Sequence, residues 1–222
     1  MKKIRLVCCF FILLSCAVMF LTVDMAEKTT IASGESVIVK RVAITFDDGP
    51  KEKTTMRLLD GLKERNVRAA FFVVGENVET NRSVIKRMYD EGHIIGNHTY
   101  LHTVLTSVSF EEAKKEIDRT NELIFDITGE KAIYIRPPCG EWNDELLYNI
   151  DMTEVLWNVD PVDWNCNDSR EVVRRVLGEV KDGSIILLHD IFESSVTAAL
   201  EIIDELKAQG YIFVGIDEIL IE

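Results

Sequence analysis

Short apolar runs alternate along the chain with longer segments whose apolar residues recur at helical spacing. A short apolar run bounded by turn residues predicts a buried strand, and helical spacing of apolar residues predicts an amphipathic helix. The strand candidates are residues 42–47, 69–75, 93–96, 132–136, 154–159, 184–189 and 211–216. The helix candidates are residues 53–65, 82–90, 110–127, 143–148 and 196–209, together with a run that contains Val172, Val173 and Val176 and that Ser169 would cap. Ser109 and Glu112 have the spacing of a capping box at the start of 110–127.

This alternation predicts an α/β fold in which helices cover a parallel sheet. Seven strands suit an incomplete relative of the eight-stranded barrel better than an open doubly wound sheet, although periodicity does not decide whether the sheet closes. We therefore expect a single domain with a distorted, TIM-barrel-like (β/α)7 fold. In such a barrel the chemistry lies at the C-terminal ends of the strands.

The N-terminal segment differs from the rest of the chain. Three basic residues precede an apolar run over residues 6–23, which predicts a signal peptide or an N-terminal membrane anchor in residues 1–26. Asp24 disfavours cleavage after Ala26, so the anchor stays open as an alternative. We expect a linker at residues 27–40, a folded domain at 41–222, and an exported protein that is secreted or anchored by residues 6–23.

Charge and cysteine usage narrow the function classes. The formal net charge is −13 and becomes −15 without residues 1–26, because three positive charges and one negative charge are removed. Nucleic-acid binding needs a basic surface, so we expect no nucleic-acid partner. Of the five cysteines only Cys139 and Cys166 lie in the folded domain, and in an exported protein they could form one disulfide.

Polar residues gather at the predicted C-terminal ends of several strands. Asp47 and Asp48 end the first strand, and His98 follows the third. Arg136 ends the fourth strand and His189 the sixth. A solvated acidic turn is the alternative for the two aspartates, since Asp, Gly and Pro all favour turns. The shared position at one end of the sheet indicates a functional site instead.

A pair of histidines has the spacing of metal ligands. His98 and His102 are four residues apart, so one helical turn would align both imidazoles, although a pair of solvated loop histidines is the alternative. Two histidines and one carboxylate leave open positions on a zinc-like ion, as hydrolysis requires. We expect one divalent ion, zinc first, with cobalt, nickel or manganese accepted by the same donors. His93, at a strand start, is interpreted as structural.

Five motifs in order carry a family resemblance. They are Thr45-Phe46-Asp47-Asp48-Gly49-Pro50, His98 to His102, Arg136-Pro137-Pro138-Cys139-Gly140, Asp160-Pro161-Val162-Asp163-Trp164 and Leu187-Leu188-His189. Over residues 41–222 the chain resembles the polysaccharide deacetylases of carbohydrate esterase family four, the NodB-homology group. Within that group it looks most like bacterial peptidoglycan N-deacetylases.

The resemblance implies a role for each matched residue. Asp48, His98 and His102 would bind the metal, Asp47 would be the general base for the attacking water, and His189 would be the general acid for the leaving amine. Arg136 would orient Asp47, and Asp163 would hold His189. The substrate-binding residues would be Pro138, Cys139 through its backbone N–H, Trp164 and Leu187.

The activity implied is metal-dependent hydrolysis of N-acetyl groups on a glycan outside the membrane, by a monomer whose only membrane contact is the N-terminal segment. Peptidoglycan N-acetylglucosamine is the expected substrate, because the muramic subgroup often lacks the second aspartate that Asp48 provides. The alternatives are N-acetylmuramic acid, chitooligosaccharides, O-acetyl groups of a xylan-type polysaccharide, and an inactive glycan-binding relative. The family usually has an aromatic residue where Cys139 stands, which leaves the substrate preference open.

Overall fold

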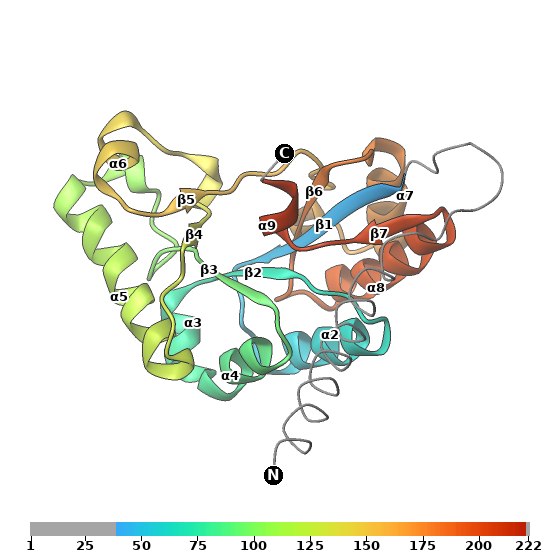
Figure 1. Ribbon diagram of the computed structural model, residues 1–222, viewed down its shortest axis with the longest axis horizontal. Helices are drawn as coiled ribbons and strands as arrows, with labels where there is room; N and C mark the ends of the chain where they lie inside the picture. Colours follow the sequence, from blue (N-terminus) through green and yellow to red (C-terminus); the bar gives the residue numbers. More distant parts are fainter. Residues whose placement is uncertain (1–38, 221–222) are drawn as a thin grey trace, which may run out of the picture. The chain divides into compact units, whose positions relative to one another are not determined.

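The centre of the fold is a sheet of seven strands whose pairings are all parallel (Figure 1). The computed structural model describes residues 39–220, so the predicted leader and nearly all of the predicted linker lie outside the described residues. The strands are β1 Lys40–Asp47, β2 Ala70–Val73, β3 Ile94–Asn97, β4 Tyr134–Ile135, β5 Thr153–Glu154, β6 Ser184–His189 and β7 Tyr211–Phe213. Their order is β5-β4-β3-β2-β1-β6, and β7 pairs with the start of β1.

Helices connect the strands, and most of them cover the outer face of the sheet (Figure 1). The α-helices are α2 Glu52–Glu64, α3 Gly75–Thr80, α4 Arg82–Asp90, α5 Phe110–Thr128, α6 Asp144–Asn149, α7 Ser169–Glu179, α8 Glu193–Ala208 and α9 Ile216–Ile219. Three short 3-10 helices lie in loops: η1 Leu105–Ser107, η2 Pro138–Gly140 and η3 Asp163–Asn165. The sheet curls into a partial barrel with one surrounding layer of helices, which confirms the predicted fold class.

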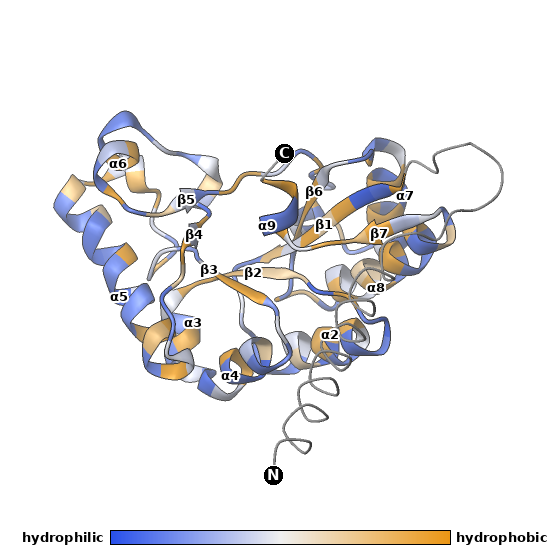
Figure 2. Ribbon diagram, in the orientation of Figure 1, coloured by the Kyte–Doolittle hydropathy of each residue, from blue (hydrophilic) through white to orange (hydrophobic). Residues whose placement is uncertain are grey.

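Alternation along β1 separates the two faces of this sheet. Val42, Ile44 and Phe46 pack into the main hydrophobic core. Figure 2 shows that the strands are largely apolar, whereas the helices around them carry both apolar and polar residues. Ala43 instead belongs to a smaller apolar cluster on the inner face. Because successive side chains of a strand point to opposite faces, Asp47 lies on that inner face as well. The register of β1 thus places the first aspartate of the acidic pair inside the curled sheet.

The strands furthest from β1 are shorter than the periodicity predicted. β4 has two residues and β5 ends at Glu154, although residues 132–136 and 154–159 were expected to be strands. The Arg136 guanidinium accounts for part of this difference, because it donates to the carbonyl oxygens of Val155 and Leu156 beyond β5. Val159 rejoins the sheet through a single bridge to Ile186 in β6.

Helix ends follow the local sequence closely at α5 and less so at α7. The expected capping box forms at α5, where Ser109 accepts from the backbone N–H of Glu112 and that carboxylate accepts in return. At α7 the capping side chain is Asp168, which accepts from Arg170 N, whereas Ser169 is the first helical residue. Gly129 ends α5 at φ +81°, a conformation that glycine adopts without strain.

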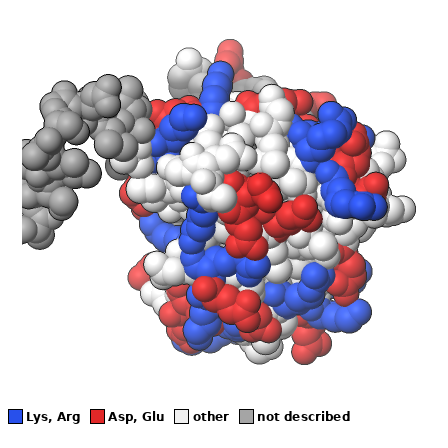
Figure 3. Space-filling view, turned by 90° about the vertical axis from the view of Figure 1, so that its right-hand side faces the viewer, with Lys and Arg blue, Asp and Glu red and all other residues white. Residues whose placement is uncertain are grey.

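The outer surface carries charges of both signs. Figure 3 shows basic and acidic side chains lying next to one another on the face it presents. Exposed ion pairs such as Arg57–Glu193 at 3.0 Å and Arg65–Asp204 at 2.7 Å join α2 and its C-terminal end to α8. None of the helices within residues 39–220 combines the length and apolar content that a membrane span requires.

Candidate active site

A cavity of about 490 Å³ opens at the C-terminal ends of the central strands. Asp47 ends β1 and His189 ends β6, and the loop after β3 carries His98 and His102. The cavity brings together residues from all five sequence motifs, as the predicted position at the strand ends requires. Its lining residues are Asp47, Asp48, His98, His102, Pro137, Cys139, Trp157, Asp160, Trp164, Leu187, His189 and Phe192.

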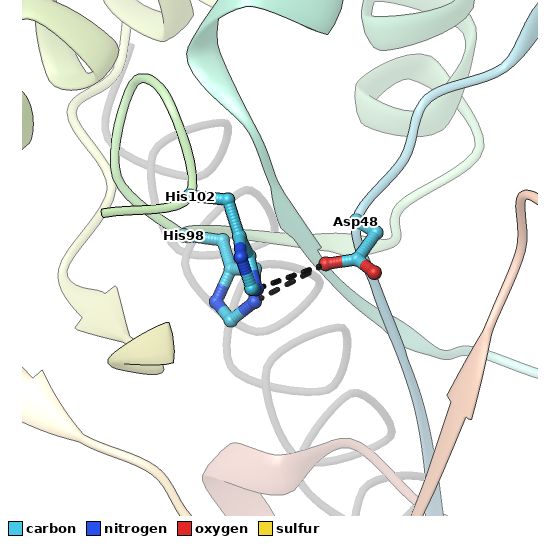
Figure 4. A group of neighbouring side chains, drawn as sticks. All are labelled: Asp48, His98 and His102. Atoms are coloured by element: carbon cyan, nitrogen blue, oxygen red, sulfur yellow. Dashed lines mark ion pairs between the residues drawn. The ribbon is translucent and has the colours of Figure 1, made fainter. Parts of the chain in front are cut away.

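Asp48, His98 and His102 form a candidate metal site (Figure 4). One ligand atom from each residue lies within 4.8 Å of the others. Asp48 Oδ1 is 3.5 Å from His98 Nε2 and 3.4 Å from His102 Nε2. That oxygen is buried and has no hydrogen-bond partner among the described residues. A buried carboxylate oxygen that faces two imidazole nitrogens fits a divalent cation at their common centre.

The protonation states of these ligands also fit a cation. Burial would raise the pKa of the Asp48 carboxyl, but His98, His189 and His102 lower it below its usual value. Burial lowers the pKa of His102, with His98 adding to the effect. The carboxylate therefore stays ionised and the imidazole neutral, which are the forms that bind metal.

The path of the chain between the two histidines differs from the prediction. No helix forms at residues 98–102, and the two imidazoles converge through a bend, with ring centroids 4.9 Å apart. Thr99 and His102 adopt left-handed backbone conformations, at φ 64° and 57°. His98 is oriented by its Nδ1, which lies 2.6 Å from the carbonyl oxygen of Arg136. Because a carbonyl only accepts, this Nδ1 carries the proton and leaves Nε2 free as a ligand.

Asp47 and Arg136 form a buried ion pair beside this site. Arg136 Nη1 lies 2.7 Å from Asp47 Oδ1 and 2.8 Å from Thr45 Oγ1. Thr45 and Asp47 share the inner face of β1, so one guanidinium reaches both. The Arg136 side chain is fully buried, and its remaining donors bond the carbonyls after β5, while its guanidinium lies over the Phe72 ring. The arrangement pairs the Asp47 side chain with a guanidinium and fixes its orientation.

His189 and Asp163 form the second pair across the cavity. His189 Nδ1 lies 2.8 Å from Asp163 Oδ1, and the backbone N–H of His189 donates to Oδ2 at 2.9 Å. Burial alone would lower the pKa of His189, but Asp163, with Asp47 and Asp48, raises it to about 9. The imidazole is therefore protonated near neutral pH, with its Nε2 toward Asp48 at 4.0 Å.

The glycine after the acidic pair has a steric reason. A Cβ at Gly49 would lie 2.3 Å from both carboxylate oxygens of Asp190, which is fully buried. Burial raises the pKa of Asp190 to about 7, and the Thr55 hydroxyl donates to this carboxyl. Only glycine lets the turn after Asp48 pack directly against this group.

The predicted substrate-binding residues lie at different depths. Trp164 is 57% exposed at the mouth, Leu187 is buried in the wall, and Cys139 is exposed in a left-handed conformation at φ 61°. Pro138 is buried, and its neighbour Pro137 lines the cavity instead. Cys139 and Cys166 are free thiols, so the disulfide considered from the sequence is not formed.

Two aromatic residues of the cavity were not predicted from the sequence. Trp157 lies in a segment that was assigned to a strand, where its ring would count as core. Phe192 precedes α8, and its ring centroid lies 6.5 Å from that of His189. Proximity to the Leu187–His189 motif is the one signal that could have indicated Phe192.

Comparison with known proteins assigns the family. The model of the family described as polysaccharide deacetylase matches residues 35–155. The chain is 40% identical over 197 residues to the peptidoglycan-N-acetylmuramic acid deacetylase PdaC of Bacillus subtilis, covering 89% of this chain and 41% of PdaC. It is 40% identical over 180 residues to the peptidoglycan-N-acetylglucosamine deacetylase PgdA of Listeria monocytogenes, covering 81% of this chain and 39% of PgdA.

A solved structure agrees with the sequence comparison. The structure of B. subtilis PdaC superposes with a TM-score of 0.80 at 41% identity, covering 83% of this chain and 92% of that chain. The protein therefore belongs to the polysaccharide deacetylase family, as the order of its five motifs predicted. It spans about two fifths of the length of PdaC and PgdA.

Proposed function

We propose that residues 41–222 form a metal-dependent hydrolase that removes N-acetyl groups from a glycan, most specifically from N-acetylglucosamine of peptidoglycan. The observation that carries the proposal is the buried Asp48 Oδ1, which faces two imidazole nitrogens at 3.4 and 3.5 Å and has no hydrogen bond among the described residues. The printed activities of PdaC and PgdA support peptidoglycan as the substrate class. The acidic net charge gives no support to a nucleic-acid partner.

Asp48, His98 and His102 would hold the ion, with zinc as the proposed metal and cobalt, nickel or manganese as substitutes. A divalent ion held by these residues would supply polarisation of the acetyl carbonyl and would favour ionisation of the attacking water. Asp47, oriented by Arg136, accepts the proton of that water. Two contacts support this division of labour: one Asp47 oxygen is bonded to Arg136, and Asp48 Oδ1 faces both imidazoles.

His189 gives its proton to the nitrogen of the departing amine. Asp163 keeps the imidazole charged and fixes the ring so that Nε2 points into the cavity. The backbone N–H of Cys139 donates to the oxyanion that develops on the acetyl group. Trp164, Leu187 and Pro138 complete the proposed substrate-binding set, in which Trp164 offers an exposed ring and Leu187 a buried wall.

The proposal extends to the location of the protein. Peptidoglycan lies outside the cytoplasmic membrane, so a deacetylase of this substrate acts after export. The basic start and the apolar residues 6–23 support export by a signal peptide or a membrane anchor, with residues 27–40 as a linker. We propose a monomer whose membrane contact is confined to that N-terminal segment.

Mass spectrometry of peptidoglycan fragments incubated with the zinc-loaded protein tests this function. We expect loss of acetyl groups from glucosamine residues, and no loss after treatment with a chelator. Loss of acetyl groups from muramic acid residues would identify N-acetylmuramic acid as the substrate instead. Acetate release from acetylated xylan alone would indicate an esterase, and bound metal without acetate release from any glycan would contradict an enzymatic role.

The pH dependence should report the His189–Asp163 pair. Replacing Asp163 by asparagine removes the charge that raises the pKa of His189 to about 9, so that pKa should fall toward the usual value of about 6.5. Because His189 acts in its protonated form, the alkaline limb of the kcat/KM profile should move to lower pH by up to about two units. Profiles of the wild type and of Asp163→Asn, measured with the same metal, check this.

The same pair makes a pH-dependent contribution to stability. A raised folded-state pKa stabilises the fold fully below about pH 6.5, and this contribution is lost as the pH rises through about 9.

The matched control for the pH profile of kcat/KM is Asp126→Asn, because Asp126 is an exposed residue of α5 and its replacement removes one negative charge at the surface. An alkaline limb that stays in place in Asp163→Asn would show that His189 is not the acid.

A further inference from the structure

The loop that carries the two imidazoles is held in a strained conformation. Thr99 lies between the candidate ligands at φ 64°, and His102 ends the bend at φ 57°. A left-handed conformation costs a β-branched residue most, on the order of 1–3 kcal/mol, and persists only where surrounding contacts enforce it. The contacts that enforce this bend therefore also determine where the imidazoles point.

One carboxylate oxygen accepts three hydrogen bonds from the tip of this bend. Glu116 Oε2, from the middle of α5, accepts from the backbone N–H of Tyr100 at 3.1 Å and of Leu101 at 2.8 Å. The same oxygen accepts from Thr103 Oγ1 at 3.1 Å. Hydrogen bonds to an ionised acceptor are roughly twice as strong as neutral ones. Glu116 thus fixes three donors of the loop between His98 and Val104, two backbone amides and one hydroxyl.

Other hydrogen bonds and ring contacts hold the remaining parts of the loop. The N–H of Thr99 donates to Asn97 Oδ1 at 2.8 Å, and the carbonyls of Thr99 and Tyr100 accept from the start of α3. The Tyr100 ring lies under the Arg119 guanidinium at 3.4 Å, and its hydroxyl donates to Glu79. These contacts hold the two ends of the bend, whereas Glu116 is the one side chain of residues 39–220 that accepts from the backbone amides of Tyr100 and Leu101.

The two imidazoles depend on the bend to different degrees. His98 is almost fully buried and is held by the carbonyl of Arg136. The His102 side chain is 43% exposed, and no hydrogen bond to its ring is found within residues 39–220. Apart from its contacts within the site, with Asp48 Oδ1 at 3.4 Å and with the His98 ring, its position rests on the backbone conformation around it. If the tip of the bend relaxed, the His102 imidazole would move away from Asp48 before the His98 imidazole did.

We infer that Glu116 is a positioning residue for the candidate metal site, and that its carboxylate preorganises the His98–His102 loop for an ion. The inference rests on the proposed function, because it takes Asp48, His98 and His102 as the ligands. Glu116 touches none of the ligand atoms and acts through the loop backbone. Groups that orient metal ligands in this indirect way contribute about 10- to 100-fold to metal affinity.

Zinc affinities of the metal-free protein, measured by competition with a chromophoric chelator, test the inference. Glu116→Ala should bind zinc about 10- to 100-fold more weakly than the wild type. Glu116→Gln should lie between the two, because its amide oxygen can still accept but carries no charge. Glu122 is exposed on the same helix and forms no ion pair within residues 39–220, so Glu122→Ala is the matched control and should bind like the wild type.

Two further readouts separate positioning from general stability. The visible spectrum of the cobalt-substituted protein should change in Glu116→Ala, because one imidazole leaves or shifts. Urea unfolding of the metal-free proteins measures the loss of stability independently. Wild-type affinity and spectrum in folded Glu116→Ala would overturn the inference, as would an equal loss in Glu122→Ala.

The same variants test the proposed metal site and the positioning role of Glu116 separately. If Glu116→Ala does not fold, Glu116→Gln decides, and unchanged affinity and spectrum in that variant overturn the inference. If the wild type itself binds neither zinc nor cobalt, the proposed metal site fails and the positioning role fails with it. Binding by the wild type together with unaltered binding by the Glu116 variants removes only the positioning role.

Discussion

Replacing Asp47 by asparagine is expected to lower kcat by roughly 10²- to 10⁴-fold while the protein keeps its metal. Asparagine has nearly the same shape, so its side-chain oxygen can still accept from Arg136, which now bonds Asp47 Oδ1 at 2.7 Å. What is lost is the basic oxygen that takes a proton from the attacking water. Turnover on acetylated glycan fragments and metal content of the purified variant are the two measurements.

Asp48→Asn is the matched variant, since it makes the same chemical change one residue away. Asp48 Oδ1 faces both imidazoles, so its neutralisation should weaken metal binding first and activity as a consequence. Raising the zinc concentration should restore part of the activity of Asp48→Asn and none of that of Asp47→Asn. Equal metal loss in both variants would contradict the separate roles of the two aspartates.

Much of this site could be predicted because strand periodicity and motif order are local properties of the sequence. The apolar run before Asp47 predicts a buried strand, and the observed strand β1 ends at that residue. The same argument predicts the end of β6 at His189. Once the strands are parallel, their C-terminal ends must meet at one edge, so the polar residues that follow them come together without any knowledge of contacts.

The parts that were missed depend on tertiary contacts. The bend at residues 98–102 exists because partners on other elements accept and donate to it, Glu116 on α5 among them. β5 ends at Glu154 in part because the Arg136 guanidinium donates hydrogen bonds to the backbone carbonyls of the next two residues. Phe192 lies beside His189 because the chain turns into α8 there. None of these features leaves a period or a spacing in the sequence.

Replacing Arg136 by methionine is expected to lower the free energy of unfolding by about 3–5 kcal/mol, because it leaves a buried carboxylate without its partner. Arg136 is fully buried, and its guanidinium donates to four acceptors, which belong to Thr45, Asp47, Val155 and Leu156. Urea denaturation of the metal-free protein measures the change. Arg65→Met, which breaks an exposed pair with Asp204, should cost only about 1 kcal/mol or less.

The double variant Asp47→Asn with Arg136→Met identifies the cause of that loss. If the cost arises from the unpaired charge of Asp47, neutralising that residue should return part of the stability, with a coupling energy of about 0.5–3 kcal/mol. Strict additivity of the two single effects would mean that Arg136 stabilises the fold through its carbonyl contacts and packing alone. Activity should stay low in all three variants, since each removes either the base or the group that orients it.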